Sequence, residues 1–129
     1  MLLKDFYTIN SIDKKDDHNF EVVIYINENH EVFKGHFPGN PVMPGVCMIQ
    51  IIKELTEQFT KSFLIMQTLA SVKFTALINP FVTPELRLEL SIVITDDYLV
   101  QVKNTTYFNE TLALKLSGVY KKTAARNSF

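Results

Sequence analysis

The sequence of 129 residues contains a single cysteine, Cys47. One cysteine excludes an intramolecular disulfide framework and the cluster of thiolates that holds a structural zinc ion. The three histidines lack the close spacing to further ligands that would build a zinc site. The sequence therefore predicts no metal or other cofactor. Cys47 is expected to be a small buried apolar residue, and His18 and His30 to be solvated loop residues.

An excess of charge of one sign and a long apolar run are also lacking. The sequence has thirteen Lys and Arg residues and fourteen Asp and Glu residues, so the charges nearly balance. No net electrostatic field therefore attracts the chain to nucleic acid or to an anionic membrane. No apolar stretch approaches the length of about 20 residues that crosses a bilayer. Charges at Lys4 and Asp5 interrupt the apolar run that a secretory signal needs. We expect a cytoplasmic protein that binds neither nucleic acid nor membrane.

Strand-forming sequence dominates both ends of the chain. Residues rich in β-branched and aromatic side chains, separated by polar turns, predict strands at 6–9, 20–26, 69–78, 86–95, 98–107 and 111–120. Strict alternation of apolar and charged residues in 86–90 indicates a sheet with one covered and one solvated face. The length suits a single domain over residues 1–129, in which the polar tail 121–129 is expected to be frayed.

One long helix is predicted in the middle of the chain. Apolar residues at helical spacing run from Val46 to Phe59, and Pro44 suits a position in the first turn. Two strands, one helix and four strands indicate an α+β domain in which a single helix packs on one antiparallel sheet. Because one helix cannot cover six strands, we expect an edge or face to pair with a second copy.

The segment between the second strand and the helix is a shaped loop that carries the chemistry. Six glycines and prolines fall within residues 35–45, which leaves little room for regular structure. Nearby prolines restrict the backbone around His36, and histidine is the side chain best suited to move protons near neutral pH. Gly45 at the helix start lets a ligand oxygen approach its N–H group and the positive end of the helix dipole. A base beside an oxyanion site suits removal of a proton α to a carbonyl.

Residues 36–46 read HFPGNPVMPGV, which resembles the active-site signature of the FabZ/FabA β-hydroxyacyl-acyl carrier protein dehydratases of fatty-acid synthesis. Weaker similarity extends to Val72, Lys73 and Phe74, to Pro80, and to the strand at 111–120. The resemblance implies a hot-dog fold, in which an antiparallel sheet of about six strands wraps one long central helix. It also implies a homodimer or trimer of dimers that dehydrates β-hydroxyacyl thioesters, carried on the phosphopantetheine arm of acyl carrier protein, to trans-2-enoyl thioesters.

The same resemblance assigns roles to residues of the signature. It makes His36 the base, the Gly45 N–H group the donor that polarises the thioester carbonyl, and the Val42 carbonyl the group that orients the imidazole. The acid is expected from the helix of a partner subunit. The residues expected to bind substrate are Phe37, Val42, Met43, Gly45 and Val46, of which Phe37 and Met43 either line an acyl tunnel or belong to the core.

The sequence departs from the family pattern at the acid. Fourteen residues after His36, where active members carry Asp or Glu, stands Gln50, which cannot donate an acidic proton. Glu54 lies one turn further on, on the same helix face, either as a substitute acid or as a plain surface carboxylate.

Several functions stay open on these residues. The chain is either a slower dehydratase in which His36 performs both proton transfers, or the partner of a paralogous hot-dog subunit that supplies the carboxylate. A third possibility is a non-catalytic acyl-carrier-binding subunit of a heteromeric dehydratase. A rival from another enzyme class is a hot-dog acyl thioesterase, because the same fold supports both reactions.

Overall fold

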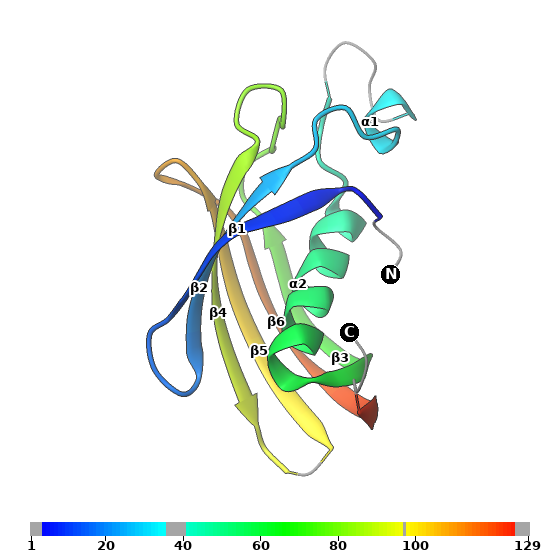
Figure 1. The fold of residues 1–129 in the computed structure, drawn as a ribbon, viewed down its shortest axis with the longest axis vertical. Coiled ribbons are helices and arrows are strands. Elements are labelled where there is room, and N and C mark those ends of the chain that lie inside the picture. Colours follow the sequence, from blue (N-terminus) through cyan, green and yellow to red (C-terminus); the bar gives the residue numbers. More distant parts are fainter. Residues whose placement is uncertain (1–3, 36–40, 97, 126–129) are drawn as a thin grey trace.

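The computed structural model describes residues 4–35, 41–96 and 98–125. Six strands form one sheet, and one long helix lies against it (Figure 1). The elements in chain order are β1 (Tyr7–Lys14), β2 (Asn19–Ile26), α1 (Val32–Gly35), α2 (Gly45–Thr60), β3 (Ser62–Phe74), β4 (Glu85–Ile94), β5 (Leu99–Phe108) and β6 (Thr111–Ala125). The α+β arrangement of one main helix and six antiparallel strands is as predicted.

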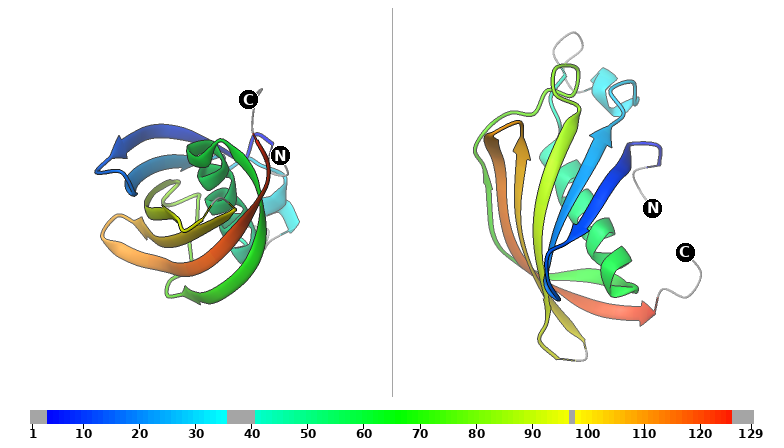
Figure 2. Two further views of the ribbon diagram at one scale, coloured as in Figure 1. Left: turned by 90° about the horizontal axis from the view of Figure 1, so that it is seen from below. Right: turned by 60° about the vertical axis from the view of Figure 1, so that its left-hand side comes forward.

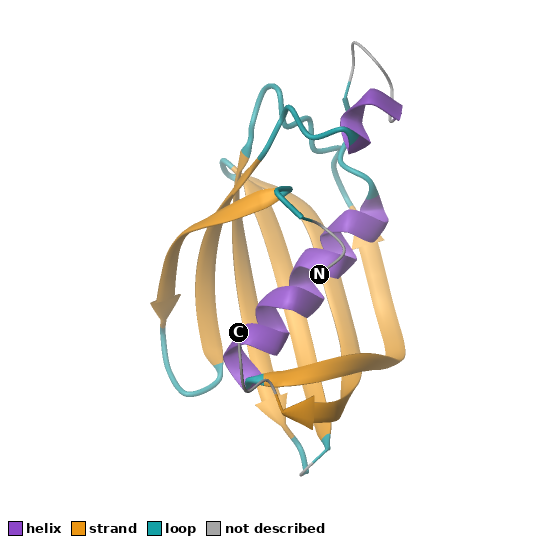
Figure 3. Cartoon of the chain, turned by 45° about the vertical axis from the view of Figure 1, so that its right-hand side comes forward, coloured by secondary structure: helices purple, strands orange, loops and turns teal. Residues whose placement is uncertain are grey.

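The sheet is antiparallel throughout and has the strand order β1-β2-β4-β5-β6-β3. It curls around α2, so the helix lies in the concave side (Figure 2). Along β4, buried residues alternate with exposed or half-buried ones, which confirms the predicted solvated face. The helix crosses this concave face diagonally (Figure 3). The two edges of the sheet are β1 and β3.

The buried face of α2 lies at the centre of the hydrophobic core. Its buried apolar side chains are Cys47, Met48, Ile51, Ile52 and Leu55. They belong to one cluster with the inward-facing residues of the strands, such as Leu88, Val100 and Leu116. The helix ends at Lys61, which adopts a left-handed conformation (φ 52°) and donates its backbone N–H to the Glu57 carbonyl. Pro44 stands just before the first helical residue instead of within the first turn.

Two predicted boundaries differ from the structure because β3 and β6 pair along most of their length. Their register runs from Ser62 opposite Ala125 to Phe74 opposite Leu114. The strand predicted at 69–78 therefore begins seven residues earlier and ends four earlier. Residues 121–125, expected to be part of a frayed tail, continue β6 and were wrongly predicted. A long antiparallel partner satisfies the backbone groups of polar sequence that has no strand signal of its own.

The β3 edge exposes an apolar surface. Among the described strands, β3 pairs only with β6, so its other edge is open. The large apolar side chains exposed on β3 and on the loop after it are Phe63, Ile65, Leu69, Phe74, Leu77, Phe81 and Val82. An open strand edge with apolar side chains is a surface that natural proteins usually cover.

Replacing Ile51 by alanine is expected to lower the free energy of unfolding by about 2–5 kcal/mol, because this fully buried side chain would leave a cavity in the core. The same replacement at Ile94, which is half exposed at the end of β4, should cost about 1 kcal/mol or less. Urea denaturation followed by circular dichroism measures both values. Equal losses would contradict the central position of α2.

Candidate functional site

The first turn of α2 borders an apolar hollow of about 230 Å³. The hollow is lined by Met43, Gly45, Met48, Phe74, Ala76, Leu77 and Ile78. The backbone N–H of Met43 donates to the Ile78 carbonyl (2.8 Å), which ties the segment before the helix to the loop after β3. The structure thus brings Met43 and Gly45, two of the residues predicted to bind substrate, to one apolar hollow.

Gly45 lies against the ring of Phe74. A Cβ atom added at Gly45 would lie 2.7 Å from the Cζ atom of Phe74, closer than real Cβ contacts allow. Phe74 is itself 52% exposed, so its ring forms the outer wall of the hollow. This close approach supplies a local reason for glycine at the helix start. This reason differs from the one predicted from the sequence, which is the approach of a ligand oxygen to the Gly45 N–H group.

Backbone donors at the helix start supply the electrostatics of the site. The first N–H groups of a helix, here those of Gly45 and Val46, have no partner within the helix and lie at its positive end. Pro44 makes no side-chain capping hydrogen bond to them. Val46 is 75% exposed, so it belongs to the surface beside the hollow and not to the buried band of the helix. The predicted oxyanion role of Gly45 is compatible with this arrangement.

His36 and Phe37 lie outside the described residues, but both described ends of their segment are anchored. On one side Phe33 of α1 is buried and stacks on Phe6, with 5.6 Å between ring centroids. On the other side Pro41 and Pro44 are buried. Val42 is half-buried next to them, and its predicted role toward His36 stays a prediction. The chain therefore enters and leaves the segment from fixed positions.

His30 differs from its prediction as a solvated loop residue. Its Nδ1 accepts a hydrogen bond from the Val32 N–H (3.1 Å), and its Nε2 lies 3.1 Å from the Lys4 carbonyl oxygen. Because Nδ1 accepts, Nε2 carries the proton and donates to that carbonyl. The ring also meets Phe6 edge-on. His30 therefore has a structural role, which the local sequence did not reveal because Lys4 and Phe6 are distant in the chain.

Gln50 and Glu54 contact each other on α2, as their spacing predicted. The Gln50 Nε2 donates to Glu54 Oε2 at 3.0 Å. The Tyr7 hydroxyl of β1 donates to Glu54 Oε1 at 2.9 Å. Glu54 is only 8% exposed, so the interpretation as a plain surface carboxylate is wrong. Tyr7 was not singled out from the sequence, since no local pattern links it to a helix residue 47 positions away.

Neither Gln50 nor Glu54 lines the hollow at the start of α2. Gln50 follows Gly45 by five positions, which turns the two backbone positions about 140° apart around the helix axis. The side chain at the acid position is therefore not directed into the hollow of its own chain. Supply of the acid by a partner subunit stays an expectation from the family resemblance.

Cys47 is buried in the first turn of α2. A helix start favours a thiolate, but burial raises the pKa of the Cys47 thiol above its ordinary value. Cys47 is therefore a packing residue, as predicted, and not a nucleophile.

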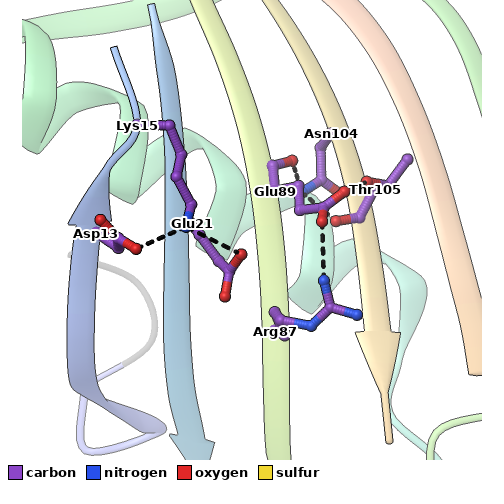
Figure 4. A network of polar contacts seen from close by, with 7 residues as sticks. All are labelled: Asp13, Lys15, Glu21, Arg87, Glu89, Asn104 and Thr105. Carbon is purple, nitrogen blue, oxygen red and sulfur yellow. Dashed lines mark hydrogen bonds and ion pairs between the residues drawn. The ribbon is translucent and has the colours of Figure 1, made fainter. Parts of the chain in front are cut away.

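A larger hollow of about 470 Å³ lies on the outer face of the sheet. Three of its charged lining residues form ion pairs: Lys15 pairs with Glu21 and with nearby Asp13, and Glu89 pairs with nearby Arg87 (Figure 4). The hydrogen bond from Lys15 to Asp13 raises the pKa of Lys15. These groups form a solvated ionic surface with no base beside a helix start, so this hollow is not the candidate active site.

The described ranges contain no group of three or more His, Cys, Asp or Glu residues that could hold a metal ion. Within the same ranges, no helix has the length and apolar character needed to span a membrane.

In the folded protein, Cys47 is expected to react with a thiol reagent near pH 8 at least about tenfold more slowly than in urea, because the buried thiol is both inaccessible and less ionised. The chain has one cysteine, so absorbance of the released reporter follows this residue alone. Equal rates in the folded and unfolded protein would contradict its burial.

Gly45→Ala is expected to lower the free energy of unfolding more when Phe74 is present than when Phe74 has been replaced by alanine, because the added Cβ collides with the Phe74 ring. The difference between the two losses, the coupling energy, should be about 0.5–3 kcal/mol. Unfolding of the four proteins of this cycle measures the coupling. Gly35→Ala is the control, since a Cβ there meets nothing within 4 Å. Additive effects of Gly45→Ala and Phe74→Ala would show that the ring does not stand over the helix start.

The ApeI-like family model, described as ApeI dehydratase, matches residues 12–110. Among relatives, the 3-hydroxyacyl-[acyl-carrier-protein] dehydratase FabZ of Lactobacillus helveticus is 33% identical over 90 residues, and that of Lactiplantibacillus plantarum is 30% identical over 90 residues. Each match covers 61% of this chain and 61% of the relative, so the chain covers less than two thirds of these proteins.

Solved structures show the same fold. The dehydratase heterocomplex ApeI:P from Xenorhabdus doucetiae superposes with a TM-score of 0.72 at 17% identity, over 89% of this chain and 97% of that chain. A hypothetical thioesterase with coenzyme A from Streptococcus pneumoniae superposes with a TM-score of 0.63 at 12% identity, over 94% and 88%. These likenesses confirm the predicted hot-dog fold. The family-model match over residues 12–110 shows further that the chain belongs to the ApeI-like dehydratase family.

Proposed function

We propose that the chain is a subunit of a dehydratase that converts β-hydroxyacyl thioesters of acyl carrier protein to trans-2-enoyl thioesters, in fatty-acid or related acyl-chain synthesis. The observation that carries the proposal is the family match over residues 12–110, which contains the whole signature at 36–46 and all of α2. The apolar hollow at the start of α2 supports it, because an acyl thioester there would meet backbone donors.

The chemistry assigned to the site is the loss of water across the α and β carbons. His36 takes the α proton, and the resulting charge moves onto the thioester oxygen beside the Gly45 N–H group. The double bond forms as the β-hydroxyl leaves with a proton, as water. Val42 orients the imidazole through its carbonyl, and Phe37, Met43 and Val46 contact the acyl thioester.

The proton for the leaving hydroxyl is the missing part. Gln50 carries no acidic proton, and both carboxylate oxygens of Glu54 already accept hydrogen bonds away from the hollow. We infer that the chain either dehydrates slowly alone, with His36 performing both transfers, or needs a carboxylate from a paralogous hot-dog subunit.

A second subunit has a surface to occupy. The open β3 edge and its exposed apolar residues suit pairing with another copy or with a paralogue, as a dimer or a trimer of dimers. The similar ApeI:P structure is itself a dehydratase heterocomplex. A mixed pair would place His36 of this chain beside the carboxylate of its partner.

The test uses the purified chain alone and mixed with a paralogous subunit, with β-hydroxyacyl-acyl carrier protein as substrate and mass spectrometry of the products. Replacing His36 by alanine should lower the dehydration rate by about 10²-fold or more, as expected when the base is lost. Gln50→Glu should raise the rate of the chain alone by up to about 10²-fold, because two carboxyl groups this close share a proton, which restores a donor at position 50.

Matched controls are His18→Ala in an exposed turn and Gln58→Glu on the exposed face of α2, which should both leave the rate unchanged. Release of the free acid instead of the enoyl thioester would favour the alternative function, hydrolysis of acyl thioesters by a hot-dog thioesterase. If neither preparation dehydrates the substrate, the chain is not a catalytic subunit, and binding of the carrier alone would identify the non-catalytic role.

A further inference from the structure

Glu54 is a buried carboxylate whose two oxygens hold two neutral side chains. Oε1 accepts from the Tyr7 hydroxyl at 2.9 Å, and Oε2 accepts from the Gln50 amide at 3.0 Å. No ion pair of Glu54 is found in the described part of the chain. A buried carboxylate without a cation depends on the hydrogen bonds that it accepts. The two bonds from Tyr7 and Gln50 therefore define the position of the Glu54 side chain.

The carboxylate fixes which way the Gln50 amide points. A carboxylate only accepts hydrogen bonds, so Gln50 has to present its NH₂ group to Glu54. Its carbonyl oxygen, Oε1, is thereby turned away from Glu54. The second hydrogen bond, from Tyr7 on β1, keeps the carboxylate itself from rotating. The orientation of a helix side chain is thus set by the edge strand of the sheet.

We propose that Tyr7 and Glu54 are positioning residues that present the Gln50 carbonyl oxygen as an acceptor for the hydroxyl of a β-hydroxyacyl chain. This inference rests on the proposed function. Where other members hold a proton donor, this chain would hold an acceptor that recognises the substrate hydroxyl without protonating it. Since Gln50 does not line the hollow of its own chain, the hydroxyl belongs to substrate bound at the helix start of a second subunit, as the family resemblance implies.

The consequence is a preference for hydroxylated chains. A saturated acyl chain of the same length offers no hydroxyl and leaves the Gln50 oxygen unpaired. If the amide turned over, its NH₂ group would face the substrate, and the preference would weaken. Tyr7 and Glu54 therefore control specificity without contacting the reacting atoms.

The first experiment observes the amide directly and needs no activity. In ¹⁵N-labelled protein, the Gln50 side-chain signals are identified by their loss in Gln50→Glu. In the parent their exchange with water should be about five- to tenfold slower than that of exposed Gln58, because one amide hydrogen is bonded to Glu54. Glu54→Gln should weaken this protection, since a neutral amide oxygen is a weaker acceptor than a carboxylate and the new side chain can also turn its NH₂ group toward Gln50. Tyr7→Phe should reduce it partly.

Tyr25→Phe is the control, because Tyr25 lies on neighbouring β2 with its side chain exposed. Unchanged Gln50 signals in both Tyr7→Phe and Glu54→Gln would overturn the inference. Urea unfolding of each variant identifies any general loss of structure, and Tyr7→Phe, which removes one oxygen atom only, serves if Glu54→Gln does not fold.

The second experiment measures preference in the preparation that dehydrates fastest. β-Hydroxyacyl and saturated acyl pantetheine thioesters of equal length compete for the site. The parent should prefer the hydroxylated chain about tenfold, and both Glu54→Gln and Tyr7→Phe should weaken that preference. The KM for the hydroxyacyl substrate should rise while kcat changes little. A merely structural role would lower the unfolding midpoint and leave the preference intact.

The two hypotheses fail in different ways. Dehydration by the parent with a preference that neither variant changes would overturn the role of Tyr7 and Glu54 and keep the proposed function. No dehydration in any preparation, with the amide protected as expected, would overturn the proposed function and the substrate role together, and would leave only the orientation of the amide established.

Discussion

Packing of the apolar face of α2 into the concave sheet is the constraint on which the rest of the structure depends. Ile51, Ile52 and Leu55 are fully or almost fully buried there, so the helix has little freedom to rotate or slide. Its first turn is therefore held beside the loop after β3, which forms the hollow at Gly45. The same packing turns Glu54 toward Tyr7 of β1 and brings Gln50 into contact with Glu54. The positions of the hollow at Gly45 and of the Gln50–Glu54 pair thus both depend on the packing of one buried helix face.

The sequence predicted the parts of the fold that local patterns determine. The apolar spacing from Val46 to Phe59 gave α2 to within a residue at each end, because a buried helix face repeats every three or four residues. The extent of β3 and β6 could not be predicted in this way. The polar end of β6 lacks a clear strand pattern and is held by pairing with the first half of β3. That pairing depends on the register between segments about fifty residues apart, which no local window contains.

The candidate site shows the same division. The contact between Gln50 and Glu54 was predicted because residues four apart share a helix face. Two other contacts were not predicted: the ring of Phe74 over Gly45, and the hydrogen bond from the Tyr7 hydroxyl to Glu54. Phe74 belongs to a stretch that resembles the family, but the resemblance does not give this contact. Each of the two aromatic side chains comes from a strand, and its position depends on how the sheet curls around the helix. The roles of His36 and Phe37 remain predictions from the sequence, since both lie outside the described residues.

Glutamine at position 50, the position at which the family pattern has an acid, changes the chemistry while preserving the shape of the helix face. A glutamate at position 50 beside Glu54 would place two carboxyl groups about 3 Å apart, and such a pair has to share a proton. With glutamine there, the single carboxylate lies one turn deeper, where Tyr7 and Gln50 occupy both of its oxygens. The helix then keeps its hydrogen bonds and loses its proton donor. Because this loss accompanies an open apolar edge on β3, the proposed function directs the search for the missing proton to a subunit that could cover that edge.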